Sequence, residues 1–205
     1  MSGLSKYILI GLVIFGSLIF LYFFIVLISM FSLFGGFDKA YSVEELKNEY
    51  SENEEKIDEV IQYFNKIKPQ DKIVKIEFKD DNILERLSII PKDKNQSSDQ
   101  LWNVSVSDVA KSQLMKSLNW SEDDIKSLKE KLDRADCISV EDGEPMKIGF
   151  KRSGLGMYSF NIFQKKETER SIYNDGCQYI LVNNKLALEY GGGAVGPQCF
   201  PGNKK

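Results

Sequence analysis

The feature that most constrains this chain is an apolar run near its amino terminus. From Tyr7 to Phe34 the sequence reads YILIGLVIFGSLIFLYFFIVLISMFSLF, without one charged side chain. About 20 apolar residues suffice to cross the hydrocarbon core of a bilayer. The alternative is a cleaved signal peptide, but its apolar core would be about 7–15 residues long and would end in a small-residue cleavage site. We therefore predict a short tail at residues 1–6 and an uncleaved transmembrane helix, embedded in the bilayer, at residues 7–34.

The basic residues beside this run bear on its orientation, because cytoplasmic flanks carry an excess of Lys and Arg. Lys6 and the amino terminus stand before the run, and Lys39 and Lys47 follow it, so the two sides are nearly balanced. The short tail and the acidic residues after the run favour an amino terminus inside. We expect a single-pass membrane protein whose carboxy-terminal domain is extracytoplasmic.

Charge and composition narrow the classes of partner. The chain has 27 basic and 30 acidic residues and no histidine. Nucleic-acid binding requires a basic patch, and we expect no nucleic-acid partner. Without histidine, neither a Ser-His-Asp triad nor a Cys-His pair can form, and three widely spaced cysteines do not make a zinc motif. We predict no catalytic residues of these kinds, no metal site and no cofactor.

A helix signal follows a predicted linker at residues 35–41. Ser42 and Glu45 have the spacing of a capping box, and apolar residues recur at three- and four-residue steps until Pro69. This pattern predicts an amphipathic helix at residues 43–67. Its apolar face either packs on the chain's own domain or forms a short self-associating seam, in which a polar residue fixes the register. The candidate seam positions are Leu46, Tyr50, Asn53 and Ile57.

The next segment predicts strands and helices in alternation. Residues 72–90 alternate apolar and polar side chains around a turn at 80–82, which is typical of a β-hairpin. A short strand then places Trp102, Val104 and Val106 on one face. Two helices follow. The first is predicted to run from Ser107 to about Leu118, and the second is predicted to begin at Ser121.

From Cys137 onward the sequence predicts short strands with connections too short for parallel pairing. The predicted fold is therefore α+β. A single N-terminal transmembrane helix is followed by one domain, residues 42–205, with an amphipathic helix, a β-hairpin, two further helices and a C-terminal antiparallel sheet.

Glycines near the carboxy terminus have the spacing of a dinucleotide-binding fingerprint. Gly191, Gly193 and Gly196 fit G-x-G-x-x-G, but that motif works only where a helix begins directly after the glycines. Pro197 and Pro201 make such a helix impossible here. We therefore expect no nucleotide, and we interpret the glycines as a tight reversal of the chain after the last strand.

The cysteines predict how that reversed tail is held. A turn at Asn183 and Asn184 would pair Leu181 with Leu186 and place Cys177 opposite Tyr190. Cys199 then returns towards Cys177, and a Cys177–Cys199 disulfide would close the loop in an oxidising compartment. Cys137–Cys177 is a rival pairing, and three free thiols are the alternative in the cytosol.

Two kinds of surface remain as candidates for function. The glycines and nearby tyrosines would form a binding surface at Gly191, Gly192, Gly193, Tyr158 and Tyr190. The acidic segment Glu141, Asp142 and Glu144 is the candidate for carboxylate catalysis, although a charged turn is its simpler interpretation.

The leading functional hypothesis is a membrane-anchored, non-enzymatic binding or protective module of the bacterial cell envelope, with a protein partner. An immunity or inhibitor protein is one form of it. The alternatives are a tethered hydrolase of envelope polymers that uses carboxylates, and an assembly subunit joined through the helix at 43–67.

Overall fold

The computed structural model describes residues 3–33, 38–93, 95–192 and 196–203. Its helices and strands follow in chain order: α1 (Gly3–Leu33), α2 (Val43–Ile67), β1 (Lys72–Phe78), β2 (Ile83–Pro91), β3 (Asp99–Ser105), α3 (Val106–Ala110), α4 (Gln113–Leu118), α5 (Glu122–Arg134), β4 (Ser139–Glu141), β5 (Met146–Ser153), β6 (Gly156–Ile162), the 3-10 helix η1 (Ser171–Tyr173), β7 (Tyr179–Leu181) and β8 (Leu186–Gly191). The fold is α+β, as predicted.

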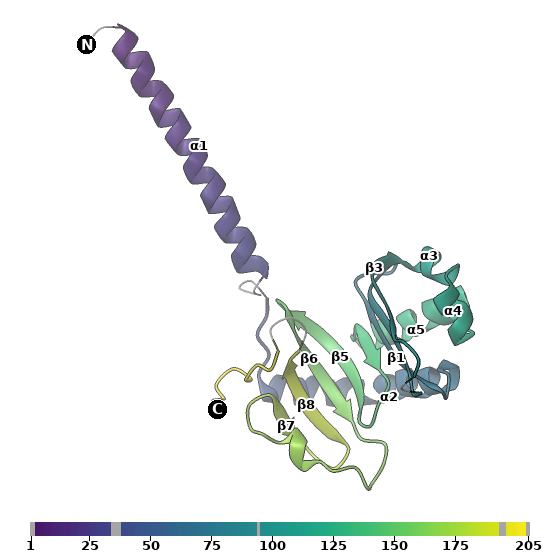
Figure 1. Cartoon of the computed structure of the whole chain (residues 1–205). Helices are drawn as coiled ribbons and strands as arrows, with labels where there is room; N and C mark the ends of the chain where they lie inside the picture. The colour runs from purple at the N-terminus through teal and green to yellow at the C-terminus, as the bar shows by residue number, and fades with distance from the viewer. Residues whose placement is uncertain (1–2, 34–37, 94, 193–195, 204–205) are drawn as a thin grey trace.

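The apolar helix α1 projects from the rest of the chain (Figure 1). It begins at Gly3, inside the predicted tail, whereas the predicted end at Phe34 and linker residues 35–37 lie outside the described residues. Residues from Ile10 to Ser32 are long and apolar enough to cross a membrane, a criterion that a signal sequence also meets. None of this segment is buried by the rest of the chain, so α1 adds nothing to the core.

The eight strands of the described residues form one antiparallel sheet, in the order β3-β2-β1-β4-β5-β6-β8-β7. The predicted hairpin, β1 with β2, is therefore continuous with the predicted C-terminal sheet. The junction is the pairing of β1 with β4, which sets Lys75 opposite Glu141 and Glu77 opposite Ser139.

The core lies between one face of this sheet and the helices α2 to α5. The capping box of Ser42 and Glu45 starts α2 as predicted, and Leu46, Ile57 and Phe64 on its inner face are fully buried. At the far end of α2, the indole N–H of Trp120 donates to the carbonyl of Ile67 at 2.7 Å.

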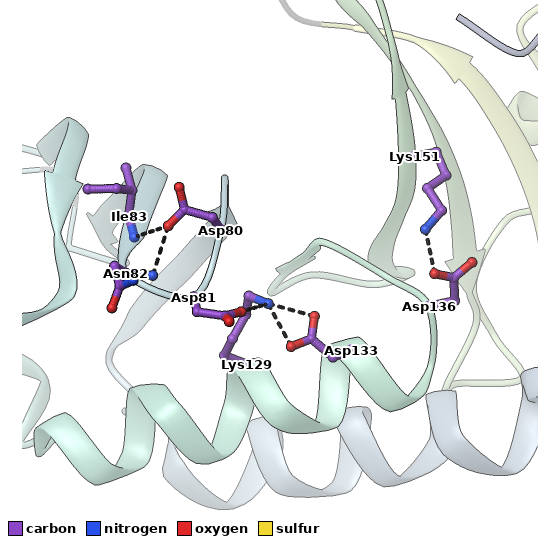
Figure 2. A network of polar contacts seen from close by, with 8 residues as sticks. All are labelled: Asp80, Asp81, Asn82, Ile83, Lys129, Asp133, Asp136 and Lys151. Atoms are coloured by element: carbon purple, nitrogen blue, oxygen red, sulfur yellow. Dashed lines mark hydrogen bonds and ion pairs between the residues drawn. The ribbon is translucent and has the colours of Figure 1, made fainter.

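The helix α5 packs against α2 and is also fixed to the turn between β1 and β2 (Figure 2). The ammonium of Lys129 lies 3.0 Å from a carboxylate oxygen of Asp81 and 2.6 Å from one of Asp133. Asp80 shapes the turn by accepting two of its backbone N–H groups, at 2.8 and 2.9 Å. This network ties a loop of the sheet to the helical layer.

Two details of the helix predictions were wrong. The first of the two predicted helices is split into α3 and α4, because Ser112 caps a new helix by accepting the N–H of Met115. The cap of α3 is Ser105 and not Ser107.

Trp102 and Val104 do not share a face either. Asn103 between them has a φ of 48°, a left-handed conformation that interrupts the alternation of a strand. Val104 packs against the core, whereas Trp102 is 55% exposed.

The predicted register of the last hairpin is shifted by one residue. Leu181 pairs with Ala187 and not with Leu186. The reason is the turn, in which Val182 and Asn183 both donate to the carbonyl of Leu186. The side chain of Asn183 accepts from the N–H groups that follow it, so the loop is wider than a two-residue turn.

The core position Ile57 offers a test of the sheet-to-helix packing. Replacing this fully buried side chain by alanine leaves a cavity, and we expect Ile57→Ala to lower the free energy of unfolding by about 2–5 kcal/mol. Urea denaturation of residues 38–205 measures the loss. The control is Glu55→Ala, at an exposed position of the same helix. An equal loss of stability in the two variants would contradict this packing.

Candidate functional site

The sheet face opposite the core carries polar side chains from every strand. Backbone pairing aligns one residue of each strand in a single row: Trp102, Arg86, Glu77, Ser139, Gly149, Ser159, Glu189 and Tyr179. We call this surface the polar face; it also includes the adjacent side chains of Lys75, Ser88, Glu141, Lys147, Arg152 and Asn161. The buried polar side chains of the described chain all lie on it: Glu77, Ser88, Ser139, Ser159, Asn161 and Glu189.

A groove of about 240 Å³ opens on the polar face. Strands and their connections supply all of its lining, and no helix contributes. The lining residues are Glu77, Glu85, Arg86, Trp102, Glu141, Lys147, Arg152, Leu155, Gly156, Met157, Gly191 and Gly192. The groove therefore brings together strands from both halves of the sheet.

Glu77 is the most deeply buried carboxylate of the groove, with 2% of the residue exposed. The guanidinium of Arg152 holds it through two nitrogens, Nε at 2.6 Å and Nη2 at 2.5 Å. Burial raises the pKa of Glu77 above its ordinary value, because a carboxylate loses its hydration there, and the charge of Arg152 offsets only part of this.

In Glu141 the neighbouring positive charges outweigh the effect of burial, which is the reverse of Glu77. Its carboxylate lies 2.9 Å from the ammonium of Lys75 and 2.8 Å from Nη2 of Arg86. Burial alone would raise its pKa, but Lys75, Lys147 and Arg86 together outweigh burial and hold the pKa of Glu141 below its ordinary value.

Glu189, on β8, is the third carboxylate of the polar face. It accepts from Lys147 at 2.7 Å and from the side-chain amide of Asn161 at 2.9 Å. Burial, together with the neighbouring Glu189, raises the pKa of Tyr179 to about 12. The three carboxylates of the polar face, Glu77, Glu141 and Glu189, thus each have a cationic partner.

Trp102 and Arg86 form the outer wall of the groove on β3 and β2. The guanidinium carbon of Arg86 lies 5.6 Å from the centroid of the Trp102 ring, within the range of a cation–π contact. The Nε atom of Arg86 is buried and has no hydrogen-bond partner among the described residues. The indole ring is exposed, so this wall presents a large aromatic surface to solvent.

Gly191 and Gly192, at the end of β8, also line the groove. Gly191 bridges to Pro197, and Gly192 donates to the carbonyl of Gly196 at 2.8 Å. The chain therefore reverses here, as the glycines predicted. A side chain at Gly191 would meet the backbone of Gln198 at 2.7 Å, so only glycine fits.

The residues of the predicted binding surface do not all lie together in the structure. Gly191 and Gly192 line the groove, and Gly193 lies outside the described residues. Tyr158 is fully buried and stacks on the half-buried Tyr190, with ring centroids 4.2 Å apart. Tyr158 therefore belongs to the core and not to an exposed surface.

The cysteines are placed as the preferred pairing requires. The sulfurs of Cys177 and Cys199 are at disulfide distance, and the N–H of Phe200 donates to the carbonyl of Cys177 at 3.0 Å. Cys137 is buried apart from them, and burial raises the pKa of its thiol to about 12. This arrangement favours Cys177–Cys199 over the rival Cys137–Cys177.

The predicted self-association positions are used within the chain. Leu46 and Ile57 are fully buried and Tyr50 is 5% exposed. The Asn53 side chain donates to the backbone carbonyl of Glu49 and accepts from Lys56. The three apolar residues therefore belong to the chain's own core, and Asn53 bonds within its own helix.

The acidic segment predicted for carboxylate chemistry does not act as a unit. Glu141 faces the groove, whereas Asp142 forms an ion pair with Lys68. Glu144 accepts from the backbone N–H groups of Gln164 and Lys165 and from the hydroxyl of Thr168. Asp142 and Glu144 hold loops in place, and only Glu141 belongs to the groove.

Sequence reasoning missed the central groove residues Glu77, Arg86, Trp102 and Arg152. Their one signal was the polar half of each alternating strand, such as Lys75 and Glu77 in β1. Pairs such as Glu77 and Arg152 are 75 positions apart and meet only through the strand order.

No family model, curated protein or solved structure matches this chain. Among the residues described, no group of three or more His, Cys, Asp or Glu is arranged to hold a metal ion. The chemistry of the groove itself is therefore the basis for inferring a function.

The opposite pKa shifts of the two groove carboxylates lead to opposite effects on stability. Glu141 has a lowered folded pKa, so its contribution is present above the unfolded pKa, about 4.3, and is lost as the pH falls through the folded pKa. Glu77 has a raised folded pKa, so its contribution is present at low pH and is lost as the pH rises through that value.

We therefore expect Glu141→Gln to destabilise the fold by roughly 1–3 kcal/mol at pH 7, with the loss disappearing in acid. For Glu77→Gln, the stability difference from wild type should move in favour of the variant as the pH rises. Urea denaturation between about pH 3 and pH 7 measures both. If the stability difference from wild type changed with pH in the same way for both variants, the assigned directions of the two pKa shifts would be wrong.

Proposed function

We propose that this protein is a membrane-anchored, non-enzymatic binding module of the bacterial cell envelope. The observation that carries the proposal is the groove, which combines an exposed tryptophan, a set of paired charges and two glycines. Such a concave site with a few fixed polar groups is the usual form of a ligand-binding site.

The helix α1 supports the anchoring part of the proposal. In this proposal it stays uncleaved and crosses the bilayer. Its segment from Ile10 to Ser32 is uncharged and unburied, and exposing so much apolar surface to water is unfavourable. A bilayer removes that cost.

The pair Cys177 and Cys199 supports an extracytoplasmic domain, because disulfides persist in oxidising compartments and are rare in the cytosol. A composition rich in Lys, Asn and Ile motivates the bacterial envelope. An immunity or inhibitor protein, whose partner is another protein, is one form that such a module takes.

A second candidate, an envelope-polymer hydrolase, is favoured by the carboxylates of the groove. Glu77 and Glu141 lie on adjacent strands and have pKa values shifted in opposite directions, as general acid and nucleophile or base require. Dye release from labelled cell walls tests this candidate. Activity that Glu77→Gln and Glu141→Gln abolish, and that the loop variant Glu144→Gln retains, would establish it.

Counting free thiols tests the extracytoplasmic assignment. Cells that express the full chain are denatured in a maleimide polymer that adds mass to each thiol. We expect one adduct without reductant, at Cys137, and three after reduction, because Cys177 and Cys199 are joined in an oxidising compartment. Cys137→Ala should reduce the first number to zero. Three adducts without reductant would place the domain in the cytosol, and the intact mass reports whether α1 is retained.

Photo-crosslinking tests the groove as the binding site. A photoreactive amino acid at Trp102 should capture an envelope component, because this position is exposed on the groove wall. The control is Ile172 on η1, which is 65% exposed and does not line the groove. Equal capture at the two positions would show that the groove has no special role.

A further inference from the structure

The groove has no net charge. Its lining includes three carboxylates, Glu77, Glu85 and Glu141, and three cationic side chains, Arg86, Lys147 and Arg152. A site for a phosphate or another anion needs an excess of positive charge, and a site for a cation needs the reverse. The balance therefore favours a neutral ligand.

The paired groups of the groove still form hydrogen bonds. Arg152 and Glu77 hold each other in a fixed position. Nε of Arg86 is buried and has no partner among the described residues, so a ligand in the groove can reach only the exposed part of this side chain. The Arg86 side chain is 25% exposed, so an acceptor in the groove can reach its guanidinium. A carbonyl oxygen is a strong acceptor for such a charged donor.

Trp102 supplies a flat apolar surface beside these polar groups. Between residues 38 and 203, Trp102 and Ile172 are the large apolar side chains that the described chain exposes. An indole ring joins a large contact area to a polar N–H. A ligand that fits must therefore have an apolar face and polar edges, as a sugar ring does.

A protein segment fits this groove less well. The centres of protein interfaces are depleted in Lys and Glu, whereas four of the side chains that line this groove are Lys or Glu. Its volume is about 240 Å³. That space suits one sugar unit with its substituents better than a protein surface.

The chain also holds the groove close to the end of α1. A carboxylate oxygen of Asp38 accepts from the N–H of Gly154 at 2.5 Å, next to Leu155 in the groove lining. Five residues lie between Ser32 and Asp38, so the Cα atoms of these two residues are at most about 20 Å apart. If α1 crosses the bilayer, the groove lies near its outer surface, where envelope glycans are accessible.

We propose that the groove binds a neutral N-acetylated sugar unit of an envelope glycan. The sugar ring lies on Trp102, and its acetamido carbonyl accepts from Arg86. This inference rests on the proposed binding function and adds the chemical class of the ligand.

Saturation-transfer NMR on the full chain, in a detergent without a sugar headgroup, tests the proposal. The probe is chitotetraose, and cellotetraose, which lacks the acetamido groups, is its matched control. We expect saturable binding of chitotetraose and at least about tenfold weaker binding of cellotetraose. The affinity should be unchanged between about 0.05 M and 0.5 M salt, because the site is neutral.

Three variants assign the contacts. Trp102→Ala should weaken chitotetraose binding at least about tenfold. Arg86→Lys keeps the charge beside Glu141 but removes the planar guanidinium, so its preference for chitotetraose over cellotetraose should disappear. Ile172→Ala should bind as wild type does, and thermal unfolding confirms that each variant is folded.

Absence of chitotetraose binding at about 10 mM, equal binding by Trp102→Ala, or a steep loss of affinity with salt would each overturn the proposal. If chitotetraose does not bind but Trp102 captures a protein by photo-crosslinking, the sugar inference fails and the binding module stands. If neither is observed, the proposed function fails as well.

Discussion

The ion pair of Glu77 and Arg152 sets the character of the polar face. A carboxylate with 2% exposure cannot stay ionised without a partner, since an unpaired buried charge is very costly. Arg152 supplies this partner through two nitrogens. The ammonium of Lys147 is the corresponding partner of Glu189. The polar face is thus crowded with charges that largely cancel. This cancellation leaves fixed donors and acceptors but no strong field, and it therefore restricts the kind of ligand that the groove can recognise.

Much of the local structure could be predicted from the sequence, because short-range signals determine it. The capping box at Ser42 and the apolar spacing after it give both ends of α2, and the Asp80 turn between alternating residues gives the first hairpin. The glycines before Pro197 give the reversal that brings Cys199 back to Cys177. In each case the responsible residues lie within one helix or one turn.

The groove could not be predicted in the same way, because it depends on pairings between distant strands. The pairing of β1 with β4 joins the two halves of the sheet, and no local pattern specifies it. One residue in a left-handed conformation, Asn103, separates Trp102 from the face of Val104. A wider turn around Asn183 shifts the last hairpin by one position. Small backbone departures of this kind decide which side chains meet.

Tyr158 joins the two ends of the folded domain. Its hydroxyl accepts from the N–H of Tyr41 at 3.2 Å, where the chain arrives from α1, and its ring lies 6.1 Å from that of Phe200 in the tail. Terminal segments usually fray independently of the core and of each other. Here the two ends share one buried ring, so loosening of one removes packing from the other. Tension applied along α1 would therefore be felt in the packing of the carboxy-terminal tail through Tyr158.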